Sequence, residues 1–309
     1  PSFSPPVKTL ALPALAALQK RLGGADEPPR LLSLLGHIAY FRGFDAIVVP
    51  ERTTTLIRHL LPARTSLIFT PHGAGDRAVT FDRRDRFFDS ALVAGEKSER
   101  MMLDAGTIRP GHYAVNGYVK LDFMRRLSAT RPPLFDNDRP TVLYAPHFRA
   151  ELSSWPLLGT QIISAFAAQQ TYNLVVAPHI RLFHRASRQA RARIAAMAVP
   201  GKILIDLGSK RVLDMSYTSG ADICLGDVSS QVYEFLDTPR PCVFLNAHAV
   251  AWQEDANYLF WTLGEVADSV AGAMAAVGRA SAEHPRYSAL QKETLALSVG
   301  GDPAGAARR

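Results

Sequence analysis

The sequence has few cysteines and no long apolar run, and each scarcity limits the class of protein. Its two cysteines, Cys224 and Cys242, lie in short apolar runs typical of buried strands, so we expect core thiols and no disulfide framework. No apolar run approaches the roughly 18 residues that a membrane-spanning helix needs, and the amino terminus does not resemble a secretory signal. We therefore expect a cytoplasmic protein.

Several common motifs are missing as well. The sequence has neither the Gly-x-x-x-x-Gly-Lys-Ser/Thr loop of P-loop NTPases nor a well-placed Gly-x-Gly-x-x-Gly of NAD enzymes. The Gly-x-Ser-x-Gly elbow of serine hydrolases is absent too. Because the sequence has no His-x-x-x-His or Cys-x-x-Cys pair, we predict no metal site and no bound cofactor.

Acidic residues are outnumbered by basic ones. The sequence has 28 Asp and Glu against 35 Lys and Arg, a formal charge of +7. This charge suits an anionic partner such as a nucleotide, a phosphate-bearing polymer or an acidic membrane surface. The densest basic cluster, from Arg185 to Arg193, lies on a predicted helix without interleaved aromatic residues, so we expect no nucleic-acid partner.

What is present is a long alternation of strand and helix patterns. The 309 residues exceed the usual size of one core and predict two domains. Residues 131–138 are rich in proline, asparagine and aspartate and predict a linker, which places the domains at residues 1–130 and 131–309. In the first half, strands are predicted at residues 44–50, 66–70 and 90–95, with helices at 53–61 and 96–105.

The second half alternates more regularly. Strands are predicted at residues 141–145, 174–177, 202–205, 223–225 and 242–245, and an alanine-rich helix over 267–282 closes the chain. The fold class is therefore α/β with a doubly wound parallel sheet. Such sheets bind ligands outside the carboxyl ends of their strands.

Three histidines follow predicted strands, and a proline precedes each of them. They are His72, His147 and His179. A single histidine is more often a packing or surface residue, but its repetition at strand ends indicates a ligand site. With a pKa of about 6.5, histidine can accept a hydroxyl proton or, when charged, hold a phosphate.

The segment from Gly226 to Ser230 joins a predicted strand to a predicted helix. Either Ser229 or Ser230 can cap the helix, which stabilises it by about 1 kcal/mol. Alternatively, the free N–H groups, the positive helix end and both hydroxyls can receive a diphosphate. Glu234 lies one turn further on, where its carboxylate can accept hydrogen bonds from ribose. The strand-end position favours the phosphate site.

Five segments in order resemble the CDP-glycerol glycerophosphotransferases of teichoic acid and capsule synthesis. TPHGAG resembles the family's Trp-His-Gly-Thr stretch, VNGYVKLD its Gly-Tyr-Pro-Arg-x-Asp, and VLYAPHFR its Tyr-Ala-Pro-Thr-Trp-Arg. VVAPHI resembles the segment with a second family histidine, and ADICLGDVSSQVYEFL the Ser-Asp-x-x-x-Thr-Asp-Tyr-Ser-Ser signature. The resemblance covers residues 66 to 246. It implies two Rossmann-like domains of the GT-B type that face each other across a cleft.

The resemblance also implies a reaction and its residues. A glycerol-phosphate or related polyol-phosphate unit moves from a CDP-linked donor to a hydroxyl of a glycan or lipid-linked acceptor, at the inner face of the cell membrane. His72 is then the base, and His179 helps to neutralise the diphosphate. His147 stands where the family has Thr, and it is a third catalytic candidate from its strand-end position. The implied donor-binding residues are Gly73, Arg149, Asp227, Ser229, Ser230 and Glu234.

Other functions stay open from the sequence. A GT-B glycosyltransferase with a nucleotide-sugar donor can use the same fold and the same serine-rich turn. A non-catalytic regulator or scaffold can keep the fold without turnover. A nucleic-acid binder has the least support because the basic residues are scattered.

Overall fold

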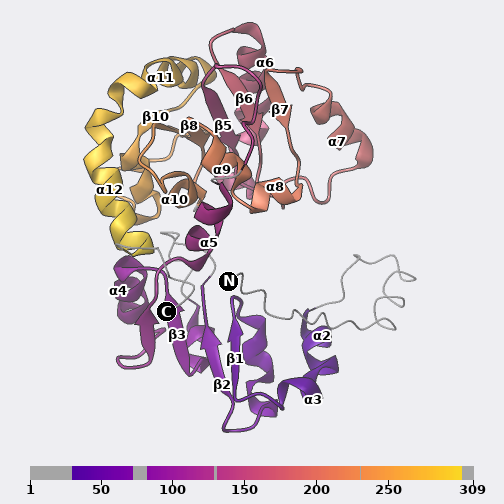
Figure 1. Ribbon diagram of the computed structural model, residues 1–309, viewed down its shortest axis with the longest axis vertical. Helices are drawn as coiled ribbons and strands as arrows, with labels where there is room; N and C mark the ends of the chain where they lie inside the picture. The colour runs from indigo at the N-terminus through magenta and orange to yellow at the C-terminus, as the bar shows by residue number, and fades with distance from the viewer. Residues whose placement is uncertain (1–29, 72–81, 129–130, 230, 301–309) are drawn as a thin grey trace. The chain divides into compact units, whose positions relative to one another are not determined.

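The computed structural model describes residues 30–71, 82–128, 131–229 and 231–300. The chain divides into two compact units, and Figure 1 shows the elements of each. The described parts of the first unit are residues 30–71, 82–93 and 100–114. Those of the second are residues 94–99, 115–128, 131–229 and 231–300. The division into domains 1–130 and 131–309 stays a prediction.

The first unit is built on a sheet in the order β1-β2-β3-β4. Its strands are β1 (Ala46–Val49), β2 (Ser66–Phe69), β3 (Ser90–Val93) and β4 (Tyr113–Val115), and the pairs β1–β2 and β2–β3 are parallel. Its helical segments are α2 (Arg30–Gly36), α3 (Ile38–Phe41), η1 (Thr53–Leu60) and η3 (Arg83–Phe87), together with residues 100–104 of α4 (Glu96–Asp104), whose first four residues belong to the second unit. Alternate residues of the middle strands fill a small core, in which Phe69 and Phe88 stack with ring centroids 4.8 Å apart.

The second unit is built on a parallel sheet in the order β10-β9-β8-β5-β6-β7. Its strands are β5 (Thr141–Ala145), β6 (Asn173–Val176), β7 (Ile203–Ile205), β8 (Ile223–Gly226), β9 (Cys242–Leu245) and β10 (Glu265–Ala267). The chain moves outward from β5 to β7, then returns to place β8 beside β5 and moves outward the other way. The strand order therefore reverses between β5 and β8, which is the topological switch point of this sheet.

Helices cover both faces of the larger sheet because its strands are apolar on both sides. One face packs on α6 (Thr160–Ala168) and α11 (Val270–Glu283). The other packs on α9 (Ser216–Gly220), α10 (Gln231–Phe235) and the 3-10 segment η6 (Ala256–Leu263). The remaining helical segments are α5 (Val119–Ser128), η4 (Ala150–Leu152), η5 (Trp155–Gly159), α7 (Arg188–Ala195), α8 (Lys210–Leu213) and α12 (Pro285–Val299).

The strands β8 and β9 carry the two cysteines. Cys224 and Cys242 are register partners on these neighbouring strands, and both are buried free thiols. Their predicted burial in core strands is therefore confirmed. Close to them, the half-buried Arg240 guanidinium donates to the carbonyl oxygens of Thr218 at 2.8 Å and Ala221 at 2.5 Å, and also to that of Phe235. It thus satisfies carbonyls that the ends of α9 and α10 leave unpaired.

The predicted strands of both halves agree with the structure to within about two residues, but some elements were missed. The helix predicted over 267–282 is α11, yet it does not close the chain, because α12 begins at Pro285. Proline suits a first helical position, whereas α12 lacks the regular apolar stripe that would reveal it. No helix within the described ranges is long and apolar enough to cross a membrane.

Candidate functional site

The carboxyl ends of β5, β6 and β8 carry the polar turns of the second unit. His147 follows β5, His179 follows β6, and Asp227 follows β8 directly. Since β5 and β8 border the switch point, His147 and Asp227 come from its two sides. The backbone N–H of His147 donates to Asp227 Oδ2 at 2.8 Å, so the two turns are joined by a hydrogen bond.

Asp227 is a deeply buried polar group of this site. Its Oδ2 also accepts a hydrogen bond from the N–H of Ser154 at 2.8 Å, while the Ser154 hydroxyl lies 2.7 Å from that of Tyr144. Within the described residues, Oδ1 has no hydrogen-bond partner. Burial raises the pKa of this carboxyl from 3.8 to about 6, although the bonds from Ser154 and His147 oppose the rise.

The two histidines of the second unit lie together around one aromatic ring. The ring centroids of His147 and His179 are 6.0 Å apart, and each lies 4.5 Å from that of Phe148. The Arg181 guanidinium lies over the same Phe148 ring, 4.4 Å from its centroid. This is a favourable cation–π contact that holds an exposed positive charge beside both imidazoles.

Both imidazoles use the same nitrogen to hold their own turn. His147 Nδ1 accepts a hydrogen bond from the N–H of Arg149 at 3.0 Å, and His179 Nδ1 accepts one from the N–H of Arg181 at 3.1 Å. Burial, aided by the positive charge of Arg181, lowers the pKa of His179 from 6.5 to about 4. His179 is therefore neutral near pH 7 when no ligand is bound.

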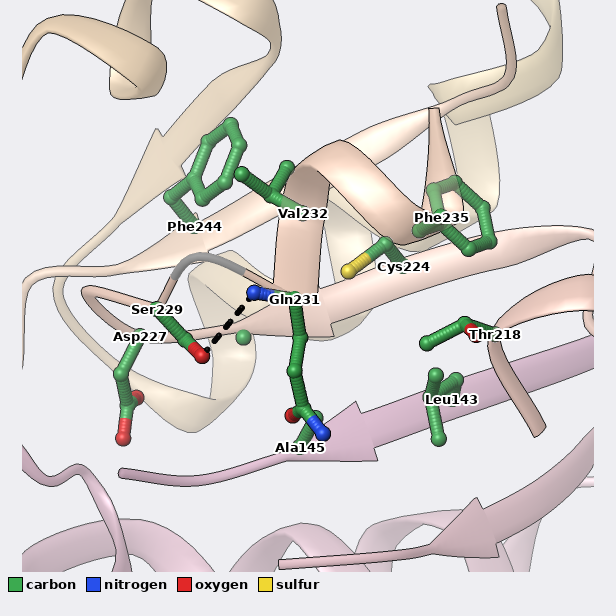
Figure 2. A pocket seen from close by; sticks show the side chains of 11 residues that line it. Leu143, Ala145, Thr218, Cys224, Asp227, Ser229, Gln231, Val232, Phe235 and Phe244 are labelled. Carbon is green, nitrogen blue, oxygen red and sulfur yellow. Dashed lines mark hydrogen bonds between the residues drawn. The ribbon is translucent and has the colours of Figure 1, made fainter. Parts of the chain in front are cut away.

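The turn after β8 leads into α10 beside a small pocket. Figure 2 shows the Ser229 hydroxyl turned back to the backbone nitrogen of Gln231, whose N–H donates to it at 3.3 Å. Ser229 thus caps α10 as predicted for one of the two serines. The rest of the lining is mostly apolar and comes from β5, β8, β9, α9 and α10: Leu143, Ala145, Thr218, Cys224, Val232, Phe235 and Phe244.

Glu234 lies in α10 and is buried. Its Oε1 accepts hydrogen bonds from the Tyr118 hydroxyl at 3.1 Å and from Lys120 Nζ at 2.5 Å. Its Oε2 is buried without a hydrogen-bond partner in the part of the chain that the structure describes. The carboxylate is thus held by residues at the start of α5, and one oxygen stays available to a further donor.

The structure gathers most of the predicted residues that it describes. His147, His179, Asp227 and Ser229 lie on the turns after β5, β6 and β8. Arg149 is exposed on the first of these turns, with a long ion pair of 3.9 Å to Glu151. The structural placements of His72, Gly73 and Ser230 lie outside the described residues. The functional roles of all these residues stay predictions.

Several residues of the site were not foreseen from the sequence. Phe148 and Arg181 complete the cluster around the histidines, and Ser154 shares the Asp227 carboxylate. Tyr118 and Lys120 hold Glu234. The sequence contained a signal for Arg181, because Ala-Pro-His-x-Arg occurs after both β5 and β6. It contained none for Ser154, whose role depends on a contact with Asp227 across 73 residues. No group of three or more His, Cys, Asp or Glu in the described segments is arranged to hold a metal ion.

No protein-family model matches the sequence, and no curated protein matches it significantly. Solved structures do. The wall teichoic acid polymerase TagF soaked with CDPG aligns with a TM-score of 0.60 and 14% identity, over 85% of this chain and 70% of that chain. The UDP-GlcNAc 2-epimerase of Neisseria meningitidis bound to UDP-GlcNAc aligns with a TM-score of 0.60 and 13% identity, over 90% of this chain and 78% of that chain. The S. aureus MnaA–UDP structure aligns with a TM-score of 0.58 and 13% identity, over 90% of this chain and 76% of that chain.

At these identities the likeness shows the fold and no more. The chain has the two-domain, Rossmann-like GT-B fold, and the predicted fold class is confirmed. The neighbours include a polymerase and an epimerase, which are enzymes of different reactions. They do not by themselves assign a reaction to this chain.

Proposed function

We propose that the chain is a GT-B transferase that moves a glycerol-phosphate or related polyol-phosphate unit from a CDP-linked donor to an acceptor hydroxyl. The acceptor is a glycan or a lipid-linked chain in cell-surface polymer synthesis. The family resemblance of five ordered segments and the likeness to TagF support this choice of donor.

The observation that carries the proposal is the placement of the polar turns at the switch point of the larger sheet. Open α/β sheets bind their ligands in the crevice outside the strand ends at this point. Here the turns after β5 and β8 supply His147, Asp227 and Ser229, and the neighbouring turn after β6 supplies His179. Imidazoles, a hydroxyl and two arginines nearby form a donor-rich surface that suits a diphosphate.

The proposed reaction is an attack of the acceptor hydroxyl oxygen on the β-phosphorus of the donor. A new oxygen–phosphorus bond forms as the bond to the bridging oxygen breaks, and CMP leaves with the electron pair. His72 accepts the hydroxyl proton as the base. Glu234, with one carboxylate oxygen still unpartnered among the described residues, accepts from the ribose, and Ser229 and Ser230 donate to the phosphates.

The test is release of CMP from CDP-glycerol in the presence of a panel of glycan and lipid-linked acceptors. The proposal expects acceptor-dependent CMP release that falls at least about a hundredfold in His72→Ala, because a base contributes this much or more. His59→Ala, an exposed histidine outside the site, is the control and should retain the wild-type rate. Activity that is unchanged in His72→Ala would remove His72 as the base.

A second candidate is a transferase that uses a nucleotide sugar. It is favoured by the structures with bound UDP-GlcNAc and UDP, whose alignments cover 90% of this chain. The same assay separates the candidates, since UDP or GDP release from nucleotide sugars without CMP release selects the second. No turnover of any donor, with binding retained, would indicate a regulator or scaffold.

A further inference from the structure

A further histidine lies at the carboxyl edge of the larger sheet. His248 follows β9, and its exposed side chain reaches the segment after β5, where Nε2 lies 3.0 Å from the Ser153 carbonyl oxygen. The next residue of that segment, Ser154, donates its N–H to Asp227. His248 and Asp227 therefore contact adjacent residues of one segment, and the imidazole lies beside the switch point of the sheet.

The charge of His248 acts on the buried carboxyl of the site. Burial raises the pKa of Asp227 to about 6, and the hydrogen bonds from Ser154 and His147 oppose this rise, as does the positive form of His248. A positive charge stabilises a carboxylate in this way when it lies nearby. The imidazole of His248 thus belongs to the same polar site, although no sequence motif indicated it.

The turn that carries His248 is held in an unusual backbone conformation. Ala249 has a φ of 52°, a left-handed conformation that is costly for a residue with a Cβ atom. Asn246 closes the turn, because its Oδ1 accepts the N–H of Val250 at 2.9 Å and its Nδ2 donates to the Val250 carbonyl at 3.0 Å. Strained conformations that are held by their surroundings cluster at ligand sites. The strain therefore agrees with a functional turn.

The hydrogen bond to Ser153 fixes the tautomer of His248. A carbonyl oxygen can only accept a hydrogen bond, so Nε2 carries the proton. In the neutral ring Nδ1 is then an acceptor with a lone pair. Within the described part of the chain, Nδ1 makes no hydrogen bond. His248 therefore presents an acceptor nitrogen on an exposed side chain.

His147 and His179 have the opposite arrangement. Their Nδ1 atoms accept the N–H groups of Arg149 and Arg181, so the proton of each neutral ring lies on Nε2. These two rings can offer an N–H to a phosphate oxygen, whereas His248 offers an acceptor. An ionised phosphate oxygen has no proton to donate to an acceptor, but a hydroxyl has one. His248 is therefore suited to a hydroxyl group and not to a phosphate.

We propose that Nδ1 of His248 accepts a hydrogen bond from a hydroxyl of the transferred unit and so favours donors that carry a polyol or a sugar. This inference rests on the proposed function for the donor, and it adds the residue that contacts the transferred unit. The ribose hydroxyls are assigned there to Glu234, which Tyr118 and Lys120 hold in place. The transferred unit is the other part of the donor with hydroxyls.

Isothermal titration with CDP and CDP-glycerol tests the proposal, because the two ligands differ in the glycerol unit. His248→Gln retains a side-chain N–H for the Ser153 carbonyl and lacks an acceptor at the position of Nδ1. It should bind CDP as wild type does and lose about three- to tenfold in affinity for CDP-glycerol, the effect of one neutral hydrogen bond. His248→Phe lacks both nitrogens and should lose at least as much affinity for CDP-glycerol. His59→Gln, at an exposed histidine of the first unit, is the matched control and should change neither affinity.

The two variants separate a substrate contact from a structural one. If His248 only anchors its turn, His248→Gln should bind both ligands as wild type does, and only His248→Phe should bind them less tightly. That result would refute the proposal, as would an equal loss for CDP and CDP-glycerol in His248→Gln. Because His248 is exposed, both variants should fold, and urea unfolding checks this.

Failure of the proposed function gives different results. A wild type that prefers CDP-glycerol to CDP and releases no CMP would refute the reaction and leave the assignment of His248 standing. Binding of a nucleotide sugar but not of CDP-glycerol would refute the CDP-linked donor. A selective loss of affinity for that sugar in His248→Gln would then still support the contact. Equal wild-type affinity for each donor and its nucleoside diphosphate, or no binding at all, would overturn it.

Discussion

The buried carboxylate of Asp227 should make the folded chain less stable at neutral pH than at mildly acidic pH. Its pKa rises from 3.8 to about 6 on folding, mainly through burial. Each pKa unit corresponds to about 1.4 kcal/mol, so the ionised form destabilises the fold by about 3 kcal/mol. Because the folded state holds the proton more tightly, this penalty is absent below about pH 4, grows as pH rises, and is complete above about pH 6.

Asp227→Asn removes the charge and keeps an oxygen that can accept from the N–H groups of His147 and Ser154. Its amide would place a donor where Oδ1 has no partner among the described residues, which costs about 1–3 kcal/mol. At pH 7 the variant should therefore range from equal in stability to about 2 kcal/mol more stable than wild type. As the pH falls from 7 to 4, the wild type should gain about 2 kcal/mol of stability relative to the variant.

Urea unfolding at several pH values measures this directly, because the midpoint and slope give the free energy of unfolding. Asp138→Asn, at an exposed position in the predicted linker, is the control, and its stability relative to wild type should not depend on pH in this way. Parallel pH dependence of Asp227→Asn and wild type would refute the argument. So would an Asp227 carboxyl that titrates near its usual pKa in an NMR measurement of the folded chain.

Three further predictions follow from other contacts. Arg240→Leu should lower the free energy of unfolding by about 3 kcal/mol, seen in urea, because it leaves buried carbonyls unpaired. Gly264→Ala should lower the free energy of unfolding by about 3 kcal/mol or more, since a Cβ there would lie 2.2 Å from the carbonyl oxygen of Cys242. Its matched control is Gly278→Ala in α11, where a Cβ meets open space, and this variant should raise the free energy of unfolding by up to about 1 kcal/mol. His179, with a pKa of about 4, should titrate below pH 5 in NMR spectra of the ligand-free chain; a midpoint near 6.5 would contradict its burial.

The local elements could be predicted from the sequence because apolar runs and turn residues mark short buried strands directly. β5 and β9 were placed to the residue. Elements that were missed have weak local signals: β4 and β10 have three residues each, and α12 has no clear apolar stripe. Their existence depends on packing against distant parts of the chain, which no local pattern records.

The candidate site was predictable in its residue types and not in its contacts. Prolines, histidines and serines at strand ends are visible in the sequence, but the order of strands is not. That order brings Asp227 to His147 across 80 residues. Nor does the sequence reveal that Lys120 and Tyr118 hold Glu234, or that Nδ1 of each imidazole is already occupied. Protonation states therefore had to come from geometry.

In the proposed donor site, the same contacts give a carboxylate that destabilises the fold a structural role. Asp227 Oδ2 joins the turn after β8 to the turn after β5 through the N–H of His147, and the Pro146 carbonyl joins that turn to the one after β6 through the N–H of His179. Three turns from separate strands are thus linked, one pair through the Asp227 carboxylate and the other through a hydrogen bond between backbone groups. A site of this kind needs little reorganisation when an anion binds, which conserves binding free energy. The Asp227 carboxylate thus lowers the stability of the fold and, through the same contacts, preorganises the site.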